Sequence, residues 1–197
     1  DAVLDYAKMT RYEVEDPAHW FNQQQIDSFH EIVSQKTSDA KISREVGRYA
    51  AASGGLGAAK QLMIGLMSPT AGYLLIEKYY TLFSRGAVIK VNKIGPTSVE
   101  IISTPKPGVD EKPHQCENRA GTFESMAKLF TEKFARVDHP ECLHNGNPQC
   151  RYVVTWEKTP SFIWKHIRNY FLVLAIPLFL SLFWLVTLST WSTALLI

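Results

Sequence analysis

Apolar residues recur every three or four positions through the first part of the chain, a spacing that predicts amphipathic helices. Residues 1–21 show no clear period and are expected to form an irregular N-terminal segment. The first helix is expected to begin after Asn22, because Asn22 can cap it while Gln25 returns the hydrogen bond. Ser38 is expected to cap a second helix, which the Gly54-Gly55 pair ends.

Two further helices are expected before the pattern changes. The third carries Met63 and Met67 among its apolar residues. The fourth is expected to start at Ser68-Pro69, because serine is a favoured cap and proline suits the first helical position. It is expected to end near Gly86.

From Ala87 onward apolar and polar residues alternate, which is the period of a β-strand. Residues 87–94 and 97–103 are rich in Val and Ile and are joined by Gly95-Pro96, so they are expected to pair as a β-hairpin. A proline-containing loop then leads to a fifth helix, which is expected to start near Cys116. One face of this helix carries Phe123, Met126, Ala127 and Phe130.

A second hairpin is expected between Asp138 and Trp156. Asn145-Gly146 lies in its turn, and these residue types tolerate the positive φ that a tight turn requires. Helices, hairpin, helix and hairpin in this order predict an α+β fold class, with helices packed on a small antiparallel sheet of two β-hairpins.

The last segment has a different character. Residues 170–197 contain no charged side chain, and this length exceeds the roughly 20 apolar residues that cross a bilayer. A transmembrane helix is therefore expected, and Pro177 would kink it without excluding it. Lys158, Lys165 and Arg168 precede it, so the positive-inside rule places the preceding domain on the cytoplasmic side of the inner membrane.

Composition narrows the classes further. The 197 residues carry a net charge of +2 and no basic stripe, which argues against nucleic acid as a partner. Three cysteines are a poor disulfide framework and fit a reducing compartment. We expect an N-terminal segment at 1–21, a globular domain at 22–158, a basic juxtamembrane linker at 159–169 and a transmembrane helix at 170–197. Because the chain starts without Met and ends inside an apolar run, it is expected to be a fragment of a longer protein.

Cysteine and histidine residues gather around the second hairpin. Cys142 and Cys150 flank its turn, and His139 precedes Cys142 by three residues, a common spacing for two metal ligands. Cys116 can supply the fourth ligand. Because thiolate and imidazole suit tetrahedral zinc, these four residues are predicted to hold a structural zinc ion. The alternatives to His139 as a ligand are Glu141 and His144.

The same residues resemble a known family. Cys116, then His139-x-x-Cys142-x7-Cys150 and the following Arg151-Tyr152-Val153-Val154, resemble the 4-vinyl reductase domain superfamily over residues 20–157. In sensors of that superfamily three cysteines and a glutamate hold zinc, and His139 stands here where they carry the glutamate. Segments at 5–7, 19–21, 44–49 and 114–119 also look like N-terminal regions of membrane-bound bacterial sensor histidine kinases.

The resemblance implies a largely apolar cavity between the helices and the sheet. The candidate ligand-binding residues are Met63, Met67, Tyr73, Tyr80, Phe123, Met126 and Tyr152. The phenol sensors of the superfamily hold the phenol hydroxyl with a histidine and a tryptophan, and Met67 and Gly95 lie near those places here. The implied effector is therefore a small apolar or aromatic molecule other than a phenol.

Together these features favour a ligand-sensing input domain of a membrane-anchored bacterial signalling protein of the sensor histidine kinase type, acting as a homodimer. One alternative is a lipid- or acyl-binding scaffold of the trafficking-subunit type. The other is a reductase-related enzyme, which is less favoured because Gly54-Gly55-Leu56-Gly57 lies between helices and not after a strand. A zinc ion ligated fully by protein would also leave no open position for chemistry. No catalytic residue is predicted.

Overall fold

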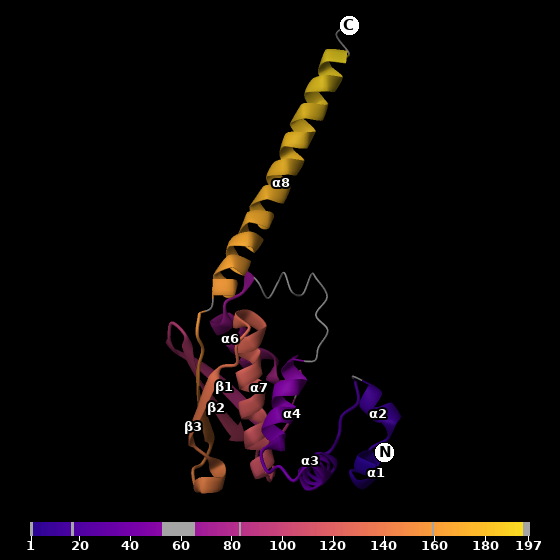
Figure 1. The fold of residues 1–197 in the computed structure, drawn as a ribbon, viewed down its shortest axis with the longest axis vertical. Coiled ribbons are helices and arrows are strands. Elements are labelled where there is room, and N and C mark those ends of the chain that lie inside the picture. Colours follow the sequence, from indigo (N-terminus) through magenta and orange to yellow (C-terminus); the bar gives the residue numbers. More distant parts are fainter. Residues whose placement is uncertain (1, 17, 53–65, 83, 159, 195–197) are drawn as a thin grey trace.

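The computed structural model of the chain describes residues 2–16, 18–52, 66–82, 84–158 and 160–194. Within these residues, seven α-helices and two short 3-10 helices accompany a four-stranded sheet (Figure 1). The helices are α1 (Ala2–Tyr6), α2 (Arg11–Glu15), α3 (Gln23–Thr37), α4 (Ile42–Ala52), α6 (Pro69–Tyr79), α7 (Pro113–Thr131) and α8 (Pro160–Ala194). The 3-10 helices are η1 (Tyr80–Leu82) and η2 (Leu143–Asn145).

Two β-hairpins form the sheet, as the alternating pattern predicts. The strands are β1 (Ala87–Gly95), β2 (Ser98–Pro105), β3 (Arg136–Glu141) and β4 (Cys150–Thr155). Their order is β1-β2-β4-β3, and each neighbouring pair is antiparallel. The hairpins join through β2 and β4, where Val99 lies opposite Val154 and Ile101 opposite Tyr152. The predicted α+β class with a small antiparallel sheet is confirmed.

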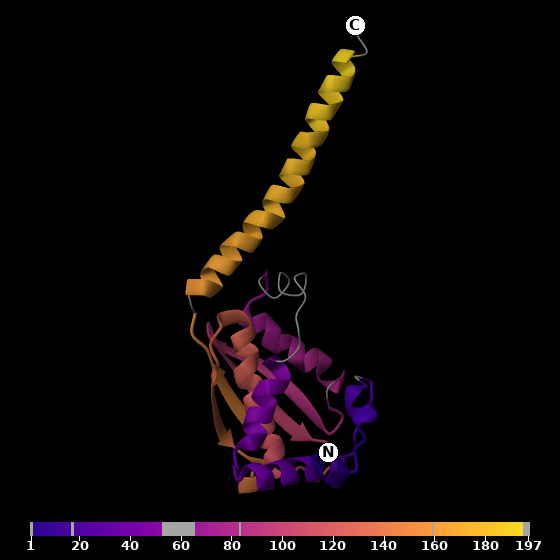
Figure 2. The ribbon, with the colours of Figure 1, turned by 45° about the vertical axis from the view of Figure 1, so that its right-hand side comes forward.

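The core lies between the sheet and helices α6 and α7, which pack on the same face. Successive side chains of a strand point to opposite faces, and the residues of β1, β2 and β4 that face the helices are buried. Tyr73 from α6 and Phe123 from α7 fill the space above them. Helix α4 packs along α7, and α3 lies across one end of that pair (Figures 1 and 2).

Two of the predicted helix starts are confirmed by the caps themselves. The Asn22 side chain accepts from the Gln25 N–H, and the Gln25 side chain accepts from the Asn22 N–H, both at 3.0 Å. At α6, Ser68 Oγ accepts from the Ala71 N–H at 3.1 Å, and Pro69 is the first helical residue. Helix α6 ends at Tyr79 and continues as η1, short of the predicted end at Gly86.

Among the other predictions about the N-terminal half, the cap at Ser38 is wrong and some lie outside the described residues. Ser38 does not cap the second helix: it ends α3 in the left-handed conformation, with φ of 53°, and α4 begins only at Ile42. The N-terminal segment contains α1 and α2, of which α2 has a reciprocal cap between Thr10 and Glu13. The Gly54-Gly55 break and most of the third predicted helix, including Met63, lie outside the described residues.

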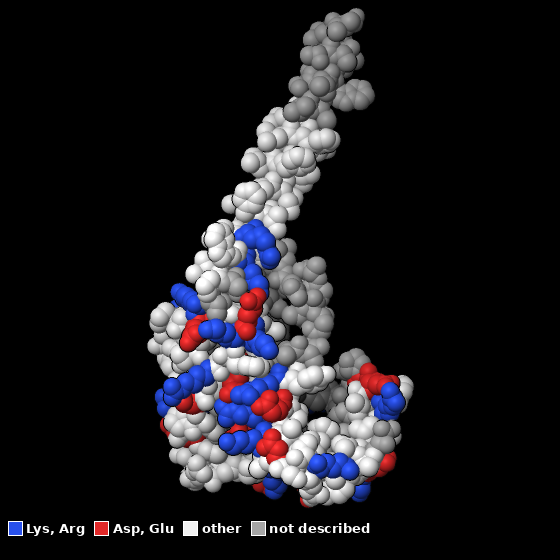
Figure 3. All heavy atoms as spheres, in the orientation of Figure 1, with Lys and Arg blue, Asp and Glu red and all other residues white. Residues whose placement is uncertain are grey.

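Helix α8 projects away from the rest of the molecule (Figures 1 and 2). Its segment Ile163–Leu185 has a mean hydropathy of 1.7 and is 6% buried, so it is long and apolar enough to cross a membrane. The helix starts at Pro160, so the residues expected to form a linker belong to it. Lys and Arg side chains gather at its base, and the described helix surface above them is uncharged (Figure 3).

Candidate ligand-binding cavity

Three thiols from separate elements meet near one edge of the core. Cys116 comes from α7, Cys150 begins β4 and Cys142 follows β3. The Sγ atoms of Cys116 and Cys150 are 3.5 Å apart, and all three sulfurs lie within 4.8 Å of one another. All three cysteines are free thiols. Because their sulfurs are also this close together, they could hold one metal ion.

The two buried thiols, Cys116 and Cys150, have pKa values that are shifted in opposite directions. The pKa of Cys150 is lowered, first because of its hydrogen bond with Cys116 and then because of hydrogen bonds with His139 and the Leu143 N–H, while burial opposes the charge. The same hydrogen bond, together with burial, raises the pKa of Cys116.

The predicted fourth ligand, His139, lies beside Cys150 but outside the group formed by the three sulfurs. The His139 ring stacks on Tyr152 at 4.2 Å between centroids, and its Nε2 is buried without a hydrogen-bond partner among the described residues. His139 does not belong to the group of ligand atoms that lie within 4.8 Å of one another. Glu141 faces Arg151, and His144 is exposed in η2.

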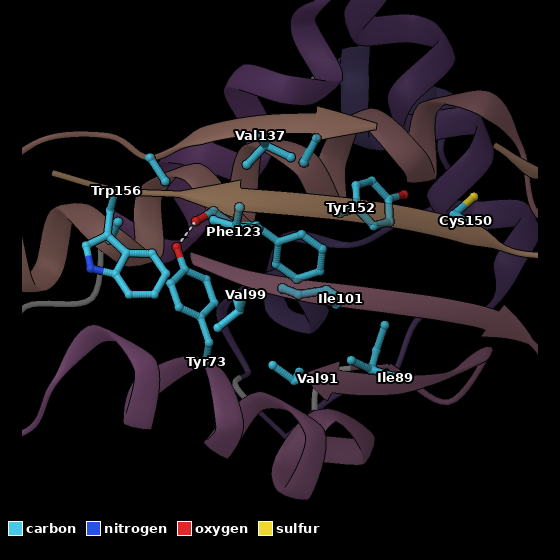
Figure 4. Packing of buried hydrophobic residues seen from close by; sticks show 14 of the residues in the cluster. Tyr73, Ile89, Val91, Val99, Ile101, Phe123, Val137, Cys150, Tyr152 and Trp156 are labelled. Carbon is cyan, nitrogen blue, oxygen red and sulfur yellow. Dashed lines mark hydrogen bonds between the residues drawn. The ribbon is translucent and has the colours of Figure 1, made fainter. Parts of the chain in front are cut away.

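Most of the predicted ligand-binding residues lie in packed surroundings. Tyr73 donates a hydrogen bond to the Phe123 carbonyl at 2.6 Å and stacks on Trp156 at 5.4 Å (Figure 4). Phe123 meets Tyr152 edge to face at 5.3 Å. These aromatic rings are 4% exposed or less. The remaining predicted residues in the described part are the half-buried Met67, Tyr80 and Met126.

A cavity of about 810 Å³ lies elsewhere, between the N-terminal segment and α7. Its walls come from the residues before α3, from α3 itself, from η1 and the loop to β1, from the loop after β2, and from the first half of α7. Of the predicted ligand residues, Tyr80 lines it.

The apolar part of the wall is formed by side chains distant in sequence. Phe21, Ile26 and Val109 line the cavity, and Trp20 lies beneath the guanidinium of Arg85, 4.0 Å from the ring centroid. A cation above an indole face is stabilised by the ring quadrupole. Trp20 and Arg85 thus form a preorganised pair that offers both an aromatic surface and a positive charge.

Arg119 on α7 is the buried charge of this cavity. Its side chain is 10% exposed and donates from Nη2 to Glu111, whose side chain is 1% exposed. Burial is the largest single influence and opposes the charge, but the hydrogen bond to Glu111, together with the nearby Tyr80, Tyr152 and Glu111 side chains, raises the pKa of Arg119. Arg119 Nη1 is buried and has no hydrogen-bond partner among the described residues. A buried donor without an acceptor is costly, so this atom favours a ligand oxygen.

His30 contributes a neutral imidazole to the same cavity. Its Nδ1 lies 2.9 Å from Ser43 Oγ, and its ring stacks on His114 at 4.5 Å. Burial, followed by the proximity of His114, lowers the pKa of His30 to about 4. The side chain is therefore uncharged at neutral pH. The Arg, Lys, Asp and Glu residues that line the described wall are then Arg85, Arg119 and Asp110, and the Asp110 carboxylate pairs with Lys112.

Comparison with known proteins places the fold. No protein-family model matches the chain, and no curated protein matches it either. An H-NOX protein from S. oneidensis in the Fe(II)NO state has a TM-score of 0.58 at 14% identity, covering 80% of this chain and 87% of that one. An H-NOX mutant from K. algicida gives 0.58 at 11% identity, covering 82% and 88%. The H-NOX domain from Shewanella woodyi gives 0.55 at 11% identity, covering 81% and 84%.

This chain has the H-NOX fold. The likeness to the 4-vinyl reductase superfamily is therefore wrong. The structural zinc predicted from the cysteine spacing and from that likeness is wrong as well, because the similar solved structures are described by Fe(II)NO ligation, haem redox potential and haem distortion. The cysteine spacing led to a wrong superfamily because it indicates only that α7 and the second hairpin lie next to each other. In this chain Cys116, Cys142 and Cys150 lie close together although its fold is not that of the superfamily that the spacing suggested.

Sequence reasoning missed the cavity and its buried charge. The walls come from segments spread between His19 and Arg119, and no local period connects them. One signal in the sequence could have identified Arg119. On the predicted helix it shares a face with Cys116, Ala120 and Phe123, and all three of these residues are buried. A charged residue at such a position is rarely buried without a partner, so it points to a polar contact inside the fold.

Proposed function

We propose that the H-NOX-like domain is the small-molecule input domain of a membrane-anchored signalling protein, and that its ligand occupies the cavity between the N-terminal segment and α7. The observation that carries this proposal is the buried Arg119, which lines a cavity of about 810 Å³ and whose Nη1 has no hydrogen-bond partner among the described residues. Ligand sites are typically concave, with a few convergent polar groups in a larger apolar lining.

The wall chemistry selects the ligand class. Trp20, Phe21 and Ile26 favour an aromatic or apolar body, and Arg119 and Arg85 favour an anionic group on it. A carboxylate suits a guanidinium because both are planar and can share parallel hydrogen bonds. We therefore take the effector to be a small aromatic carboxylate or a close chemical equivalent.

Haem, which the similar solved structures are described as holding, does not fit the residues described in this chain. Haem iron is held by His, Cys, Met or Tyr in an enclosed, mostly apolar slot. His30 is a suitable donor, but nine of the sixteen cavity residues carry polar or charged side chains. The apolar space between α6, α7 and the sheet is filled by Tyr73, Phe123 and Tyr152.

A route from the cavity to the membrane follows from the arrangement of α7. Arg119 lies in the first half of this helix, and Glu132, which ends it, pairs with Lys165 near the base of α8. A ligand that binds one arrangement of α7 more tightly than another would shift the population of both arrangements. We propose that α7 carries this shift to the membrane helix. The basic residues before the span favour a cytoplasmic domain.

The effector's identity aside, several features remain predictions from the sequence. These are the kinase as output module, the homodimer, and the ligand roles of Met63, Met67, Tyr73, Phe123, Met126 and Tyr152. The lipid scaffold and the reductase-related enzyme also remain predictions, and none of the described cavity residues favours either of them over a sensor.

The proposal is tested by calorimetric titration of the full chain in nanodiscs with 2-naphthoate, using empty nanodiscs as the blank. One saturable site per chain is expected. Gly86 lines the cavity, and a Cβ added there would lie 3.5 Å from its nearest neighbour, Val109 Cγ1. Gly86→Phe should therefore fill the cavity and abolish binding, whereas Lys41→Ala at a distant exposed site should not.

Haemin provides the second arm of this test. Added to the same protein, it should give the broad absorption spectrum of loosely bound haem and should not compete with 2-naphthoate. A sharp Soret band that is lost in His30→Ala would show that haem, and not an aromatic carboxylate, is the ligand. Absence of any 2-naphthoate binding in the native chain would contradict the proposed ligand class.

A further inference from the structure

A second cavity lies at the junction between the globular domain and the membrane helix. Its volume is about 670 Å³, and its walls come from the start of α6, the turn between β1 and β2, the residues after β4, and the first turns of α8. None of the cavity residues takes part in the ligand site near Arg119. The lining residues that matter below are Ser68, Thr70, Lys93, Trp156, Lys158 and Tyr170.

The charge of this cavity has one sign. Lys93 comes from β1 and Lys158 from the segment before α8, and both side chains are exposed. No Asp or Glu is among the described lining residues, and neither lysine forms an ion pair in the described part of the chain. Two ammonium groups from distant segments therefore face one hollow without a counter-charge, and an anion would satisfy both.

The first turn of α6 adds donors to the same hollow. Ser68, Thr70 and Ala71 line it at the N-terminus of this eleven-residue helix. The Ser68 side chain already accepts the Ala71 N–H, so the Thr70 N–H is the first-turn donor that remains for a ligand. The positive end of a helix dipole favours phosphate groups.

The position of this cavity relative to the apolar segment of α8 indicates which anion it would meet. Tyr170 lines the cavity and also begins the uncharged stretch of α8, whose apolar segment is Ile163–Leu185. With that segment in a bilayer, the cavity lies at the level of the lipid headgroups. Tyr170 and Trp156 are the residue types that favour this level. Lys165 and Arg168 add positive charge at the base of the helix, and Glu132 pairs with Lys165.

We infer that this cavity binds the headgroup of an anionic phospholipid, with Lys93 and Lys158 on its phosphate and Tyr170 against its glycerol and acyl region. The lipid thereby bridges the sheet, α6 and α8 and fixes the domain relative to the membrane. Basic pockets beside membrane helices are suited to such headgroups, because the anionic leaflet supplies them at high local concentration. This inference is independent of the ligand proposed for the other cavity.

Native mass spectrometry of the full chain tests this inference. The protein is released from membranes containing equal amounts of phosphatidylglycerol and phosphatidylcholine, and retained lipid is counted per chain. One phosphatidylglycerol is expected in the native chain. Lys93→Gln/Lys158→Gln should lower its retention about 30-fold, as expected for two lost charges near an anionic surface. The control Lys36→Gln/Lys41→Gln removes the same charge from exposed positions at the far end of α3 and should change nothing.

Three outcomes would overturn the inference. The first is equal retention of the two lipids by the native chain, which would indicate contact with the apolar surface of α8 alone. The second is the same loss of phosphatidylglycerol in both double variants, which would indicate an unspecific charge effect. The third is displacement of the lipid by millimolar inorganic phosphate, which would assign the site to a soluble anion. Circular dichroism of each variant confirms that it is folded.

Discussion

Glu124 is the residue that ties α7 to α4. Its carboxylate accepts from Arg44 Nη2 at 2.5 Å and from Arg48 Nε at 2.5 Å, and its side chain is 5% exposed. Burial raises the pKa of Glu124, but the hydrogen bonds from both guanidinium groups outweigh burial and lower it. The interaction therefore stabilises the folded state while the carboxylate is ionised.

Acid should destabilise the domain through this residue. Because the folded-state pKa of Glu124 is lowered, its contribution is complete above the unfolded value of about 4.3 and is lost as the pH falls through the folded value. Glu124→Gln should cost about 2 kcal/mol at pH 7 and should flatten the acid limb of the stability profile below pH of about 4.3. Urea unfolding between neutral and acidic pH measures both effects. An acid limb as steep in Glu124→Gln as in the native protein would contradict this account.

Tyr73 joins α6 to α7 through one buried hydrogen bond. Its hydroxyl donates to the Phe123 carbonyl at 2.6 Å, and the side chain is fully buried. Tyr73→Phe should cost about 1–2 kcal/mol of unfolding free energy while the packing of the ring is kept. Tyr12→Phe, at a side chain that is 81% exposed, is the matched control and should be neutral. Equal stability of the two variants would show that the hydrogen bond contributes nothing.

At the scale of elements, α4 and α7 approach each other through glycines. A Cβ at Gly121 would lie 1.9 Å from the Arg44 carbonyl oxygen, and one at Gly47 would lie 2.0 Å from the Asn118 carbonyl oxygen. Both obstacles are backbone atoms, so neither can rotate away. The glycines thus set the spacing of the two helices and bring Asn118 and Arg119 to the cavity wall.

Gly121→Ala should therefore destabilise the domain although alanine is the better helix former. Helix propensity alone predicts a gain of about 1 kcal/mol, whereas the clash predicts a loss of about 3 kcal/mol or more. The sign of the change in urea unfolding decides between them. Gly72→Ala is the comparison, because its Cβ would meet the end of the Phe130 ring, which can shift, and a smaller loss is expected.

The sequence determines the elements better than it determines the site. The strands of β1 and β2 and the caps of α3 and α6 follow from local patterns, so they could be predicted. Ser38 could not be assigned correctly, because serine also suits the end of a helix, and the choice depends on where α4 packs. Helices α1 and α2 are five residues each, too short for a period to predict them, and the Thr10–Glu13 cap of α2 is seen only in the structure.

Only the part of the candidate sites that residues close in sequence form could be predicted. The thiol cluster follows in part from the hairpin that separates Cys142 from Cys150, and the third thiol arrives because α7 packs beside β4. The cavity near Arg119 depends on loops from both ends of the domain, and their meeting is a property of the whole fold. The metal or ligand could not be predicted from the cysteine spacing, because the spacing shows only that the three thiols of this chain lie close together and not what they bind.

At the scale of the whole molecule, the globular domain and helix α8 do not share a hydrophobic core. The buried hydrophobic cluster lies between Tyr73 and Trp156, and the apolar segment of α8 is 6% buried. Residues 1–158 should therefore fold and remain soluble without α8, and the full chain should require detergent or lipid. Gel filtration and circular dichroism of both lengths check this. Aggregation of residues 1–158 would show that α8 belongs to the domain's core.

The central claim is that Arg119 in the cavity recognises an anionic ligand, and the most direct test compares two ligands of nearly the same shape. In calorimetric titrations of the full chain, 2-naphthoate should bind at least about tenfold more tightly than 2-naphthamide, because only the carboxylate pairs with the guanidinium. Glu111→Gln/Arg119→Gln keeps a neutral hydrogen-bonding pair in place and should remove that preference. Equal affinity of the native chain for both compounds, or a preference that survives in the double variant, would contradict the account.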